Sequence, residues 1–391
     1  MAEKISKIEC HEFTYPLSDV TADSNGFNLT YSPGDTYHRH AFAIGIETSN
    51  GLRGEYVGGT APGATQIRQV ARYLLGKNPF HREKHWSVLR NALRKYDQVG
   101  IGPLDIALWD LAGKDAGRPI HELLGSYRSR LPAYASTYFA TDGKGFKDAE
   151  SFADFAQQCL SLGFPAFKLH TWKGTTPVDI DREIETVRTV AEKVGDEMHL
   201  MLDPVCEYPT FLSALEVGKA CDRYDYLWYE DPYGDVGESQ HGNRTLREHL
   251  QTPVLHTEMV RGLEPHADAI VENATDLVRA DVEWDGGITG AMKIARVAES
   301  FGVDVEYHLP GPAVRHCMAA TRNTNYYELG LVHPESPLPH TEAPIYAGGY
   351  TDSMDSIHSD GTYPVPVDPG LGVTYDWDYI FENSVDIWSF S

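Results

Sequence analysis

Long apolar runs, a secretion signal and paired cysteines are all missing from this 391-residue sequence. No run approaches the roughly 18 consecutive apolar residues that a membrane helix needs. The opening residues, MAEKISKIECHEF, lack the apolar core of a signal peptide. The five cysteines show no CxxC spacing, which is typical of reduced thiols. The sequence therefore predicts a cytoplasmic protein that has no membrane partner.

Basic residues are also scarce. Lys and Arg together number 33 against 57 Asp and Glu, which gives a formal charge of -24. A surface of this sign repels phosphate backbones and anionic lipids, so nucleic acid is excluded as the expected partner. The length and the 41% hydrophobic content predict a substantial core divided over about two domains.

The chain changes rhythm near residue 130. Before it, alternating apolar residues at 40–48, the turn Ser49-Asn50-Gly51 and a second run at 52–57 predict two strands, with helical patterns at 66–75 and 102–116. From residue 131, eight short apolar runs follow one another, and helical stretches such as 149–162, 179–194 and 290–301 separate them. The runs are LPAYAST, FPAFKLH, MHLMLDP, YLWYEDP, TPVLHTE, LVRADVEW, VDVEYHL and YYELGLV.

Eight strands that alternate with helices favour a (β/α)8 barrel of the α/β class. We therefore expect an α+β unit at residues 1–130, a barrel at 131–345, and a Gly-, Pro- and Asp-rich segment at 346–391 that packs back on the first unit.

Three consecutive runs end in a carboxylate, namely Asp203, Glu230 and Glu258, which fall 27 and 28 residues apart. Each interval fits one strand-helix unit, and the carboxyl ends of barrel strands meet at one mouth. Three clustered anions repel one another unless a cation neutralises them. Oxygen ligands without His or Cys favour Mg²⁺. Taken singly, each acid is equally typical of a solvated loop.

Further polar groups end neighbouring runs. Lys168 and His170 lie two residues apart and so share one face of the second strand. His308 ends the seventh run, and Asp281 on the sixth could hold its ring in one tautomer and stabilise the imidazolium. Glu328, on the eighth, could donate a proton, pair with a positive side chain, or form only a salt bridge at the rim.

The order Lys168, Asp203, Glu230, Glu258, Asp281, His308 resembles the enolase superfamily, and within it the mandelate racemase-like group. GPLDIALWDLAGKDAGRPIHELLG at 102–125 is similar to the segment that leads into the family's barrel. DGGITGAMKIARVAESFGVDVEYH at 285–308 is similar to the stretch between its sixth and seventh strands. The resemblance spans nearly the whole chain.

The resemblance implies a modified barrel with an α+β capping domain whose loops, here near 19–40 and 58–65, close over the mouth. It also implies that Asp203, Glu230 and Glu258 bind Mg²⁺, that Lys168 lies beside the bound carboxylate, and that Asp281 and His308 form an acid-base pair. Asp35, His38, Arg39 and His40 become candidates to bind substrate hydroxyls, although each also fits a solvated turn. Relatives commonly assemble, so a homo-oligomer is expected.

One position departs from the family. Many relatives carry a second Lys where this chain has His170. A histidine can exchange a proton near neutrality, or it can serve only to bind a hydroxyl. The identity of the second base stays open at this point.

The family's shared step is removal of the proton α to a carboxylate, with Mg²⁺ stabilising the resulting enediolate. Polar residues on the expected capping loops suit a polyhydroxylated substrate, so we expect dehydration of a sugar acid to a 2-keto-3-deoxy acid. Racemisation, epimerisation or cycloisomerisation by the same chemistry is the alternative.

Two other classes remain for comparison. His38-Arg39-His40 supplies an HxH of the kind that binds Zn²⁺ in barrel hydrolases, but it precedes the expected first barrel strand. A non-catalytic sugar-acid binder would bind metal and ligand without exchanging the α-hydrogen.

Overall fold

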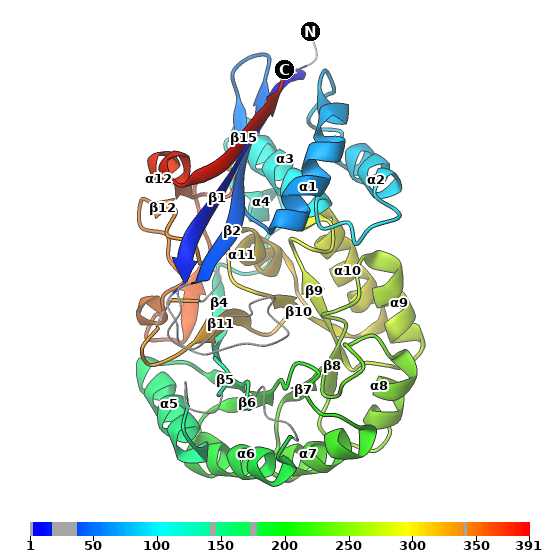
Figure 1. Cartoon of the computed structure of the whole chain (residues 1–391), viewed down its shortest axis with the longest axis vertical. Coiled ribbons are helices and arrows are strands. Elements are labelled where there is room, and N and C mark those ends of the chain that lie inside the picture. The colour runs from blue at the N-terminus through cyan, green and yellow to red at the C-terminus, as the bar shows by residue number, and fades with distance from the viewer. Residues whose placement is uncertain (1–2, 18–36, 141–145, 173–177, 337, 340–341) are drawn as a thin grey trace.

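The computed structural model describes the chain except for residues 1–2, 18–36, 141–145, 173–177, 337 and 340–341. Figure 1 shows helices in green and yellow arranged around an inner set of strands, with a smaller unit of mainly blue segments against one side. No helix in the described part is both long and apolar enough to cross a membrane.

The smaller unit, the cap, is built on a four-stranded antiparallel sheet in the order β15-β1-β2-β3. Its strands are β1 Ile5–Leu17, β2 Tyr37–Thr48, β3 Arg53–Gly58 and β15 Ser384–Phe390. Its helices are α1 Ala61–Val70, the 3₁₀ turn η1 Ala71–Leu74, α2 Arg82–Ala92, α3 Ile101–Ala116 and α4 Ile120–Leu124. The strand-turn-strand unit predicted at 40–57 is confirmed, and Gly51 in the turn has φ +86°.

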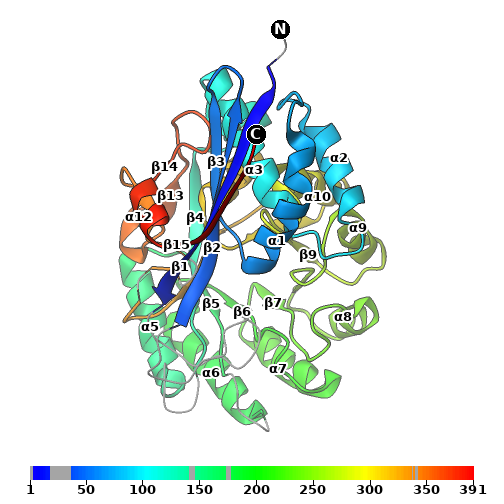
Figure 2. The same cartoon turned by 45° about the horizontal axis from the view of Figure 1, so that its top comes forward.

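Helix α3 joins the cap to the larger unit. It is buried on most sides, so it presents apolar residues both to the sheet and to the barrel. Gly54 of β3 permits this packing, because a Cβ there would lie 2.2 Å from the backbone oxygen of Ala107. Figure 2 shows α3 lying behind the strands of the cap and beside α10 Gly287–Phe301.

The larger unit is the predicted parallel barrel, with a helix after each of the first seven strands. Its strands are β4 Arg130–Thr137, β5 Ala166–Leu169, β6 His199–Leu202, β7 Trp228–Glu230, β8 Val254–His256, β9 Leu277–Asp281, β10 Asp304–His308 and β11 Tyr327–Val332. The helices that complete it are α5 Ala149–Leu162, α6 Ile180–Val194, α7 Phe211–Arg223, α8 Gln240–Arg247, α9 Leu263–Val271 and α11 Pro312–Ala320.

The ladder of parallel pairing runs from β10 through β9, β8, β7, β6, β5 and β4 to β11. Between β10 and β11 side chains replace the ladder: the amide of Leu309 donates to Glu328 Oε2 at 2.8 Å, and the amide of Gly311 donates to the Tyr327 hydroxyl at 2.7 Å. The two ends of the sheet are therefore tied together next to His308.

Apolar side chains occupy the interior of the barrel. Tyr134, Ala166, Met201, Trp228 and Leu255, one from each of five neighbouring strands, form a buried cluster. Because this cluster fills the interior, the polar groups at the carboxyl ends of the strands are left at the mouth that faces the cap.

The C-terminal segment contacts both units. It contains β12 Tyr346–Ala347, η2 Met354–Ser356, β13 Thr362–Pro364, β14 Thr374–Tyr375 and α12 Trp377–Glu382 before β15. β15 pairs with β1 of the cap, whereas β13 pairs antiparallel with β4 of the barrel. The segment therefore reaches farther than the cap alone, and the domain boundaries given above stay a prediction.

Candidate active site at the mouth of the barrel

Three carboxylates converge at the carboxyl ends of β6, β7 and β8. Asp203 follows β6 directly, Glu230 is the last residue of β7, and Glu258 lies two residues beyond β8. One oxygen from each lies within 4.8 Å of the others, and within the described ranges no other group of three potential metal ligands was found. The predicted convergence of these side chains is thus observed, while their role as ligands stays a prediction.

The backbone beside these carboxylates is strained. Asp231, directly after Glu230, has φ +30°, and Thr257, directly before Glu258, has φ +96°. A β-branched residue rarely adopts such a conformation. Thr257 is held in it by two hydrogen bonds of 2.9 Å, since its hydroxyl donates to the oxygen and accepts from the amide of Arg279. Strain of this kind concentrates where a fold must aim functional groups.

Lys168 lies between the carboxylates. Its Nζ lies 3.0 Å from Asp203, 3.0 Å from Glu230 and 2.9 Å from Glu328. Burial and the charge of Arg279 oppose its ionisation, but the carboxylates of Glu230 and Glu328 raise the pKa of Lys168 well above its usual value. The ammonium group therefore remains charged at neutral pH, which suits it to bind an anion rather than to accept a proton.

Arg279 is a site residue that sequence reasoning missed. It lies inside β9, with Nε 2.7 Å from Glu230 Oε1 and both terminal nitrogens 3.2 Å from the hydroxyl of Tyr134. The signal was available: an arginine two residues before Asp281 shares its face of an otherwise apolar strand.

The charges in this buried space do not balance without a further cation. Two permanent cations, Lys168 and Arg279, face four carboxylates. The carboxylates belong to Asp203, Glu230, Glu258 and Glu328. Burial raises the pKa of Glu258 to about 7, and the charges of Asp203 and Glu230 add to this although His308 opposes it. An excess of two negative charges and an oxygen-only donor set fit a divalent cation such as Mg²⁺.

His170 lies on the same side as Lys168. Its Nδ1 is 2.8 Å from the backbone oxygen of Thr137, and its Nε2 is 3.0 Å from Asp203 Oδ2. Since a carbonyl oxygen can only accept, Nδ1 carries a hydrogen. Nε2 faces the site, and because the Asp203 carboxylate also only accepts, their 3.0 Å contact places a hydrogen on Nε2 as well, which the ring can give up and regain.

His308 and Asp281 form the expected pair on another side of the mouth. Nδ1 of His308 lies 2.8 Å from Asp281 Oδ2, and Nε2 lies 3.5 Å from an oxygen of Glu258. Burial opposes the charged ring, but the carboxylates of Glu258 and Asp281 raise the pKa of His308 to about 9. At neutral pH the ring is an imidazolium, which can donate a proton.

Glu328 fits one of its three expected roles better than the others. Its Oε1 pairs with Lys168, and its Oε2 accepts the amide of Leu309 in the turn after His308. Burial opposes ionisation, but Lys168, Arg279 and His308 lower the pKa of Glu328 well below its usual value. A carboxylate that stays ionised cannot donate a proton, so pairing with Lys168 is the role that the geometry favours.

The candidate substrate-binding residues of the cap separate into two groups. Arg39 on β2 lines a cavity beside His308. His38 and His40 do not line it: His38 is exposed, and Nε2 of His40 lies 3.2 Å from Glu12. Asp35 lies outside the described residues. The HxH pair also belongs to no group of three ligands in the part of the chain that the structure describes.

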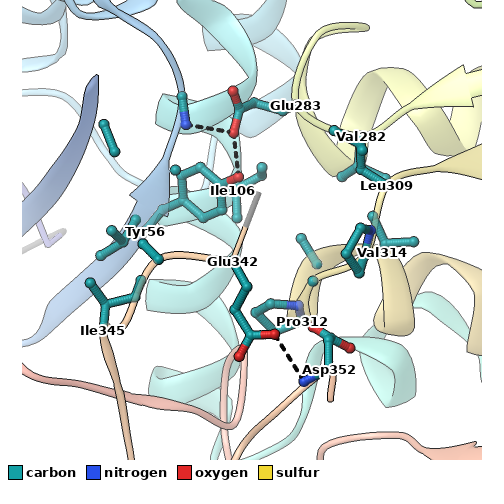
Figure 3. Close-up of a pocket in the computed structure, with 18 of the residues that line it drawn as sticks. Tyr56, Ile106, Val282, Glu283, Leu309, Pro312, Val314, Glu342, Ile345 and Asp352 are labelled. Carbon is teal, nitrogen blue, oxygen red and sulfur yellow. Dashed lines mark hydrogen bonds between the residues drawn. The ribbon is translucent and has the colours of Figure 1, made fainter. Parts of the chain in front are cut away.

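The cavity has a volume of about 120 Å³ and lies between cap, barrel and C-terminal segment. Figure 3 shows apolar walls from Ile106, Val282 and Val314, interrupted by the carboxyl groups of Glu283 and Glu342. Burial raises the pKa of Glu283 to about 7 and that of Glu342 to about 8. Asp281 and His308 line the same cavity, so the predicted acid-base pair forms part of its wall.

Comparison with known families agrees with this geometry. The family model described as "Enolase C-terminal domain-like" matches residues 151–379, which contain every predicted metal and acid-base residue. The chain therefore belongs to the enolase superfamily. The description "Mandelate racemase / muconate lactonizing enzyme, N-terminal domain" matches residues 31–125, which places the chain in that group of the superfamily.

Curated relatives cover most of the chain. D-galactarolactone cycloisomerase from Agrobacterium fabrum is 27% identical over 351 residues, which are 87% of this chain and 90% of the relative. Arabinonate dehydratase from Saccharolobus solfataricus is 28% identical over 361 residues, 87% of this chain and 89% of the relative.

Among solved structures, D-glucarate dehydratase from Agrobacterium tumefaciens, complexed with magnesium, superposes with a TM-score of 0.85 at 28% identity. The match covers 98% of this chain and 99% of that one. The expected fold, a barrel of the α/β class with a cap, is thereby confirmed.

Proposed function

We propose that this protein is a Mg²⁺-dependent acid-sugar dehydratase. It would remove the proton α to the carboxylate of an aldonic or aldaric acid and expel the β-hydroxyl as water. The enol that results tautomerises to a 2-keto-3-deoxy acid, so the only other product is water. The observation that carries this proposal is the geometry of the mouth: His308, paired with Asp281 at 2.8 Å, lies across the site from Lys168, His170 and the three converging carboxylates.

Asp203, Glu230 and Glu258 would hold the metal. When bound, Mg²⁺ supplies positive charge to a substrate carboxylate and so stabilises the enediolate. Magnesium accompanies the D-glucarate dehydratase structure described above, which supports this choice.

The lysine and the two histidines then take separate tasks. The charged Nζ of Lys168 orients the substrate carboxylate and stabilises charge where it develops. Nε2 of His170 would take the α-proton after it loses the hydrogen that it donates to Asp203 in this structure, while the Nδ1–H donated to Thr137 holds the ring in place. His308, kept as an imidazolium by Asp281, donates a proton to the departing hydroxyl.

The test is a screen of aldonic and aldaric acids with the Mg²⁺-loaded protein in D₂O, read by ¹H NMR. The proposal predicts that at least one acid forms a 2-keto-3-deoxy product with solvent deuterium at C3, the β-carbon that lost the hydroxyl. Exchange of the α-hydrogen without loss of water on every acid would reject dehydration and favour an epimerase.

A cycloisomerase is the second candidate, because a D-galactarolactone cycloisomerase is among the relatives that cover most of the chain. This reaction opens or rearranges a lactone without loss of water. Including aldarolactones in the same screen separates the two reactions by the mass of the product.

Two expectations accompany this proposal. A cytoplasmic location suits an enzyme of sugar-acid catabolism, and the family resemblance leads us to expect a homo-oligomer. Cell fractionation tests the first, and analytical ultracentrifugation tests the second.

A further inference from the structure

Glu283 lies in the turn after β9, two residues beyond Asp281, and it contacts the cap. Its Oε2 accepts hydrogen bonds from the Tyr56 hydroxyl at 2.6 Å and from the Gly59 amide at 3.0 Å. Both partners belong to the end of β3 and the turn after it. Figure 3 shows the two bonds converging on one oxygen at the upper edge of the cavity.

Two glycines of the cap make room for this residue. A Cβ at Gly58 would lie 2.6 Å from Glu283 Oε2, and a Cβ at Gly102 would lie 1.8 Å from the backbone oxygen of Glu283. Both distances are shorter than real Cβ contacts allow. The cap therefore approaches the side chain and the main chain of Glu283 more closely than any larger residue would permit.

The backbone amide of Glu283 holds the side chain of Asp281. The amide of Glu283 donates to Asp281 Oδ1 at 2.8 Å, and the amide of Trp284 donates to the same oxygen at 2.7 Å. The second oxygen of Asp281 is the partner of His308 Nδ1. Hydrogen bonds thus run without interruption from the cap through Glu283 to the imidazole.

We infer that Glu283 is a positioning residue that couples the docking of the cap to the geometry of the Asp281–His308 pair. With the cap seated, Tyr56 and Gly59 hold the turn at 282–284, and this turn aims the Asp281 carboxylate at His308. When the cap shifts, the turn is released and the acid-base pair loses its alignment. This inference rests on the proposed function for its effect on turnover.

A second contact between cap and barrel lacks this connection. Glu264 at the start of α9 accepts both terminal nitrogens of Arg90 on α2, at 3.2 and 2.6 Å, and none of its hydrogen bonds leads to Asp281. Glu264 therefore provides a matched control: it is also a glutamate of the barrel that contacts the cap through hydrogen bonds.

The experiment compares wild type with E283A, E283Q, Y56F and E264A in the Mg²⁺-loaded enzyme. Turnover is measured on the acid sugar that the screen identifies, and amide hydrogen exchange is followed in residues 53–60 and 277–284. Because misplacement of a catalytic group by about 1 Å can lower the rate about 100-fold, E283A should lower kcat by about 10- to 100-fold. The loss in kcat should exceed any change in KM, because Glu283 lines the cavity but the metal ligands are untouched.

The remaining variants set the direction of the effect. Gln can still accept both hydrogen bonds, so E283Q should keep kcat within about threefold of wild type. Y56F removes one of the two hydrogen bonds, so its kcat should lie between those of E283Q and E283A. Exchange in residues 277–284 should rise in E283A and should stay at the wild-type level in E264A.

Unchanged exchange at 277–284 in E283A would overturn the inference, as would a loss of activity in E283Q equal to that in E283A. A wild-type enzyme without activity on any acid sugar would reject the proposed function instead. The exchange data would then still decide whether the cap is coupled to the turn that holds Asp281.

Discussion

His308 is the residue at which proton transfer can be separated from metal binding. It lies beside Glu258 but is not one of the three predicted ligands, and its ring is held by Asp281. We predict that H308N lowers the kcat of dehydration by about 10²- to 10⁴-fold, because a general acid contributes this much to such a step. Isothermal titration should find a Mg²⁺ affinity close to that of wild type. Turnover at the wild-type rate would remove His308 from the mechanism.

The two histidines should differ in a second measurement. If His170 takes the α-proton, H308N should still exchange the α-hydrogen with D₂O, whereas H170N should not. NMR of the recovered substrate provides the readout. Exchange that persists in H170N and disappears in H308N would assign the base to His308.

At this scale the sequence reveals ionisable residues that end successive strands, because strand ends meet at the barrel mouth whatever the details of packing. It does not reveal partners that depend on how two units approach each other. Glu283 was missed for this reason, because it contacts Tyr56 across the cap boundary, whereas Arg279 contacts Glu230 within the barrel and could have been recognised from its place on β9. The cap residues His38 and His40 were proposed because the family resemblance places their stretch of chain over the mouth, and of residues 38–40 Arg39 alone lines the cavity.

At the scale of elements, α3 supplies the N-terminal capping group that helix α10 lacks. Gly286, the residue before α10, has no side chain that could accept a hydrogen bond from the first turn of the helix. Instead, Asp105 of α3 accepts the Thr289 amide at 2.9 Å and its hydroxyl at 2.7 Å. Gly287 permits this, since a Cβ there would lie 2.4 Å from the Asp105 carboxylate. A side chain of one unit thus satisfies the first turn of a helix in the other.

Asp105 also gives the fold a pH dependence. Burial raises the pKa of Asp105 from 3.8 to about 7, although the bonds from Thr289 oppose this. The folded state therefore binds a proton that the unfolded chain has already released, so this contribution is present at acidic pH and is lost as the pH rises through about 7. We predict that the Tm of wild type decreases as the pH rises from about 5 to about 8. The Tm of D105N, whose side chain cannot ionise, should decrease less over the same range. Parallel curves from differential scanning fluorimetry would contradict this.

Strand β1 shows which elements the sequence conceals. Its register slips between Ile5 and Lys7 against β2 and between Glu12 and Phe13 against β15. Ile8 and Cys10 are buried before the second slip, and Phe13 and Tyr15 after it, so the apolar alternation changes phase. A pattern search for period two fails across such a bulge, whereas the regular alternation of β2 predicted that strand correctly.

At the scale of the whole molecule, metal binding should stabilise the fold. A ligand that binds only the folded state at 100 times its Kd adds about 2.7 kcal/mol. For a chain of this length we predict that Mg²⁺ raises the Tm by about 2–4 °C over the EDTA-treated protein. E258Q should lose this shift, while the exposed surface variant E264Q should keep it. An equal shift in E258Q would place the stabilising ion elsewhere.

The central claim is that Asp203, Glu230 and Glu258 together hold one divalent ion at the mouth of the barrel. Anomalous diffraction from crystals soaked with Mn²⁺ tests it most directly. We predict a single strong peak bonded to one oxygen of each of the three carboxylates. A peak bound by other side chains, or three carboxylates that point apart with no ion between them, would contradict it.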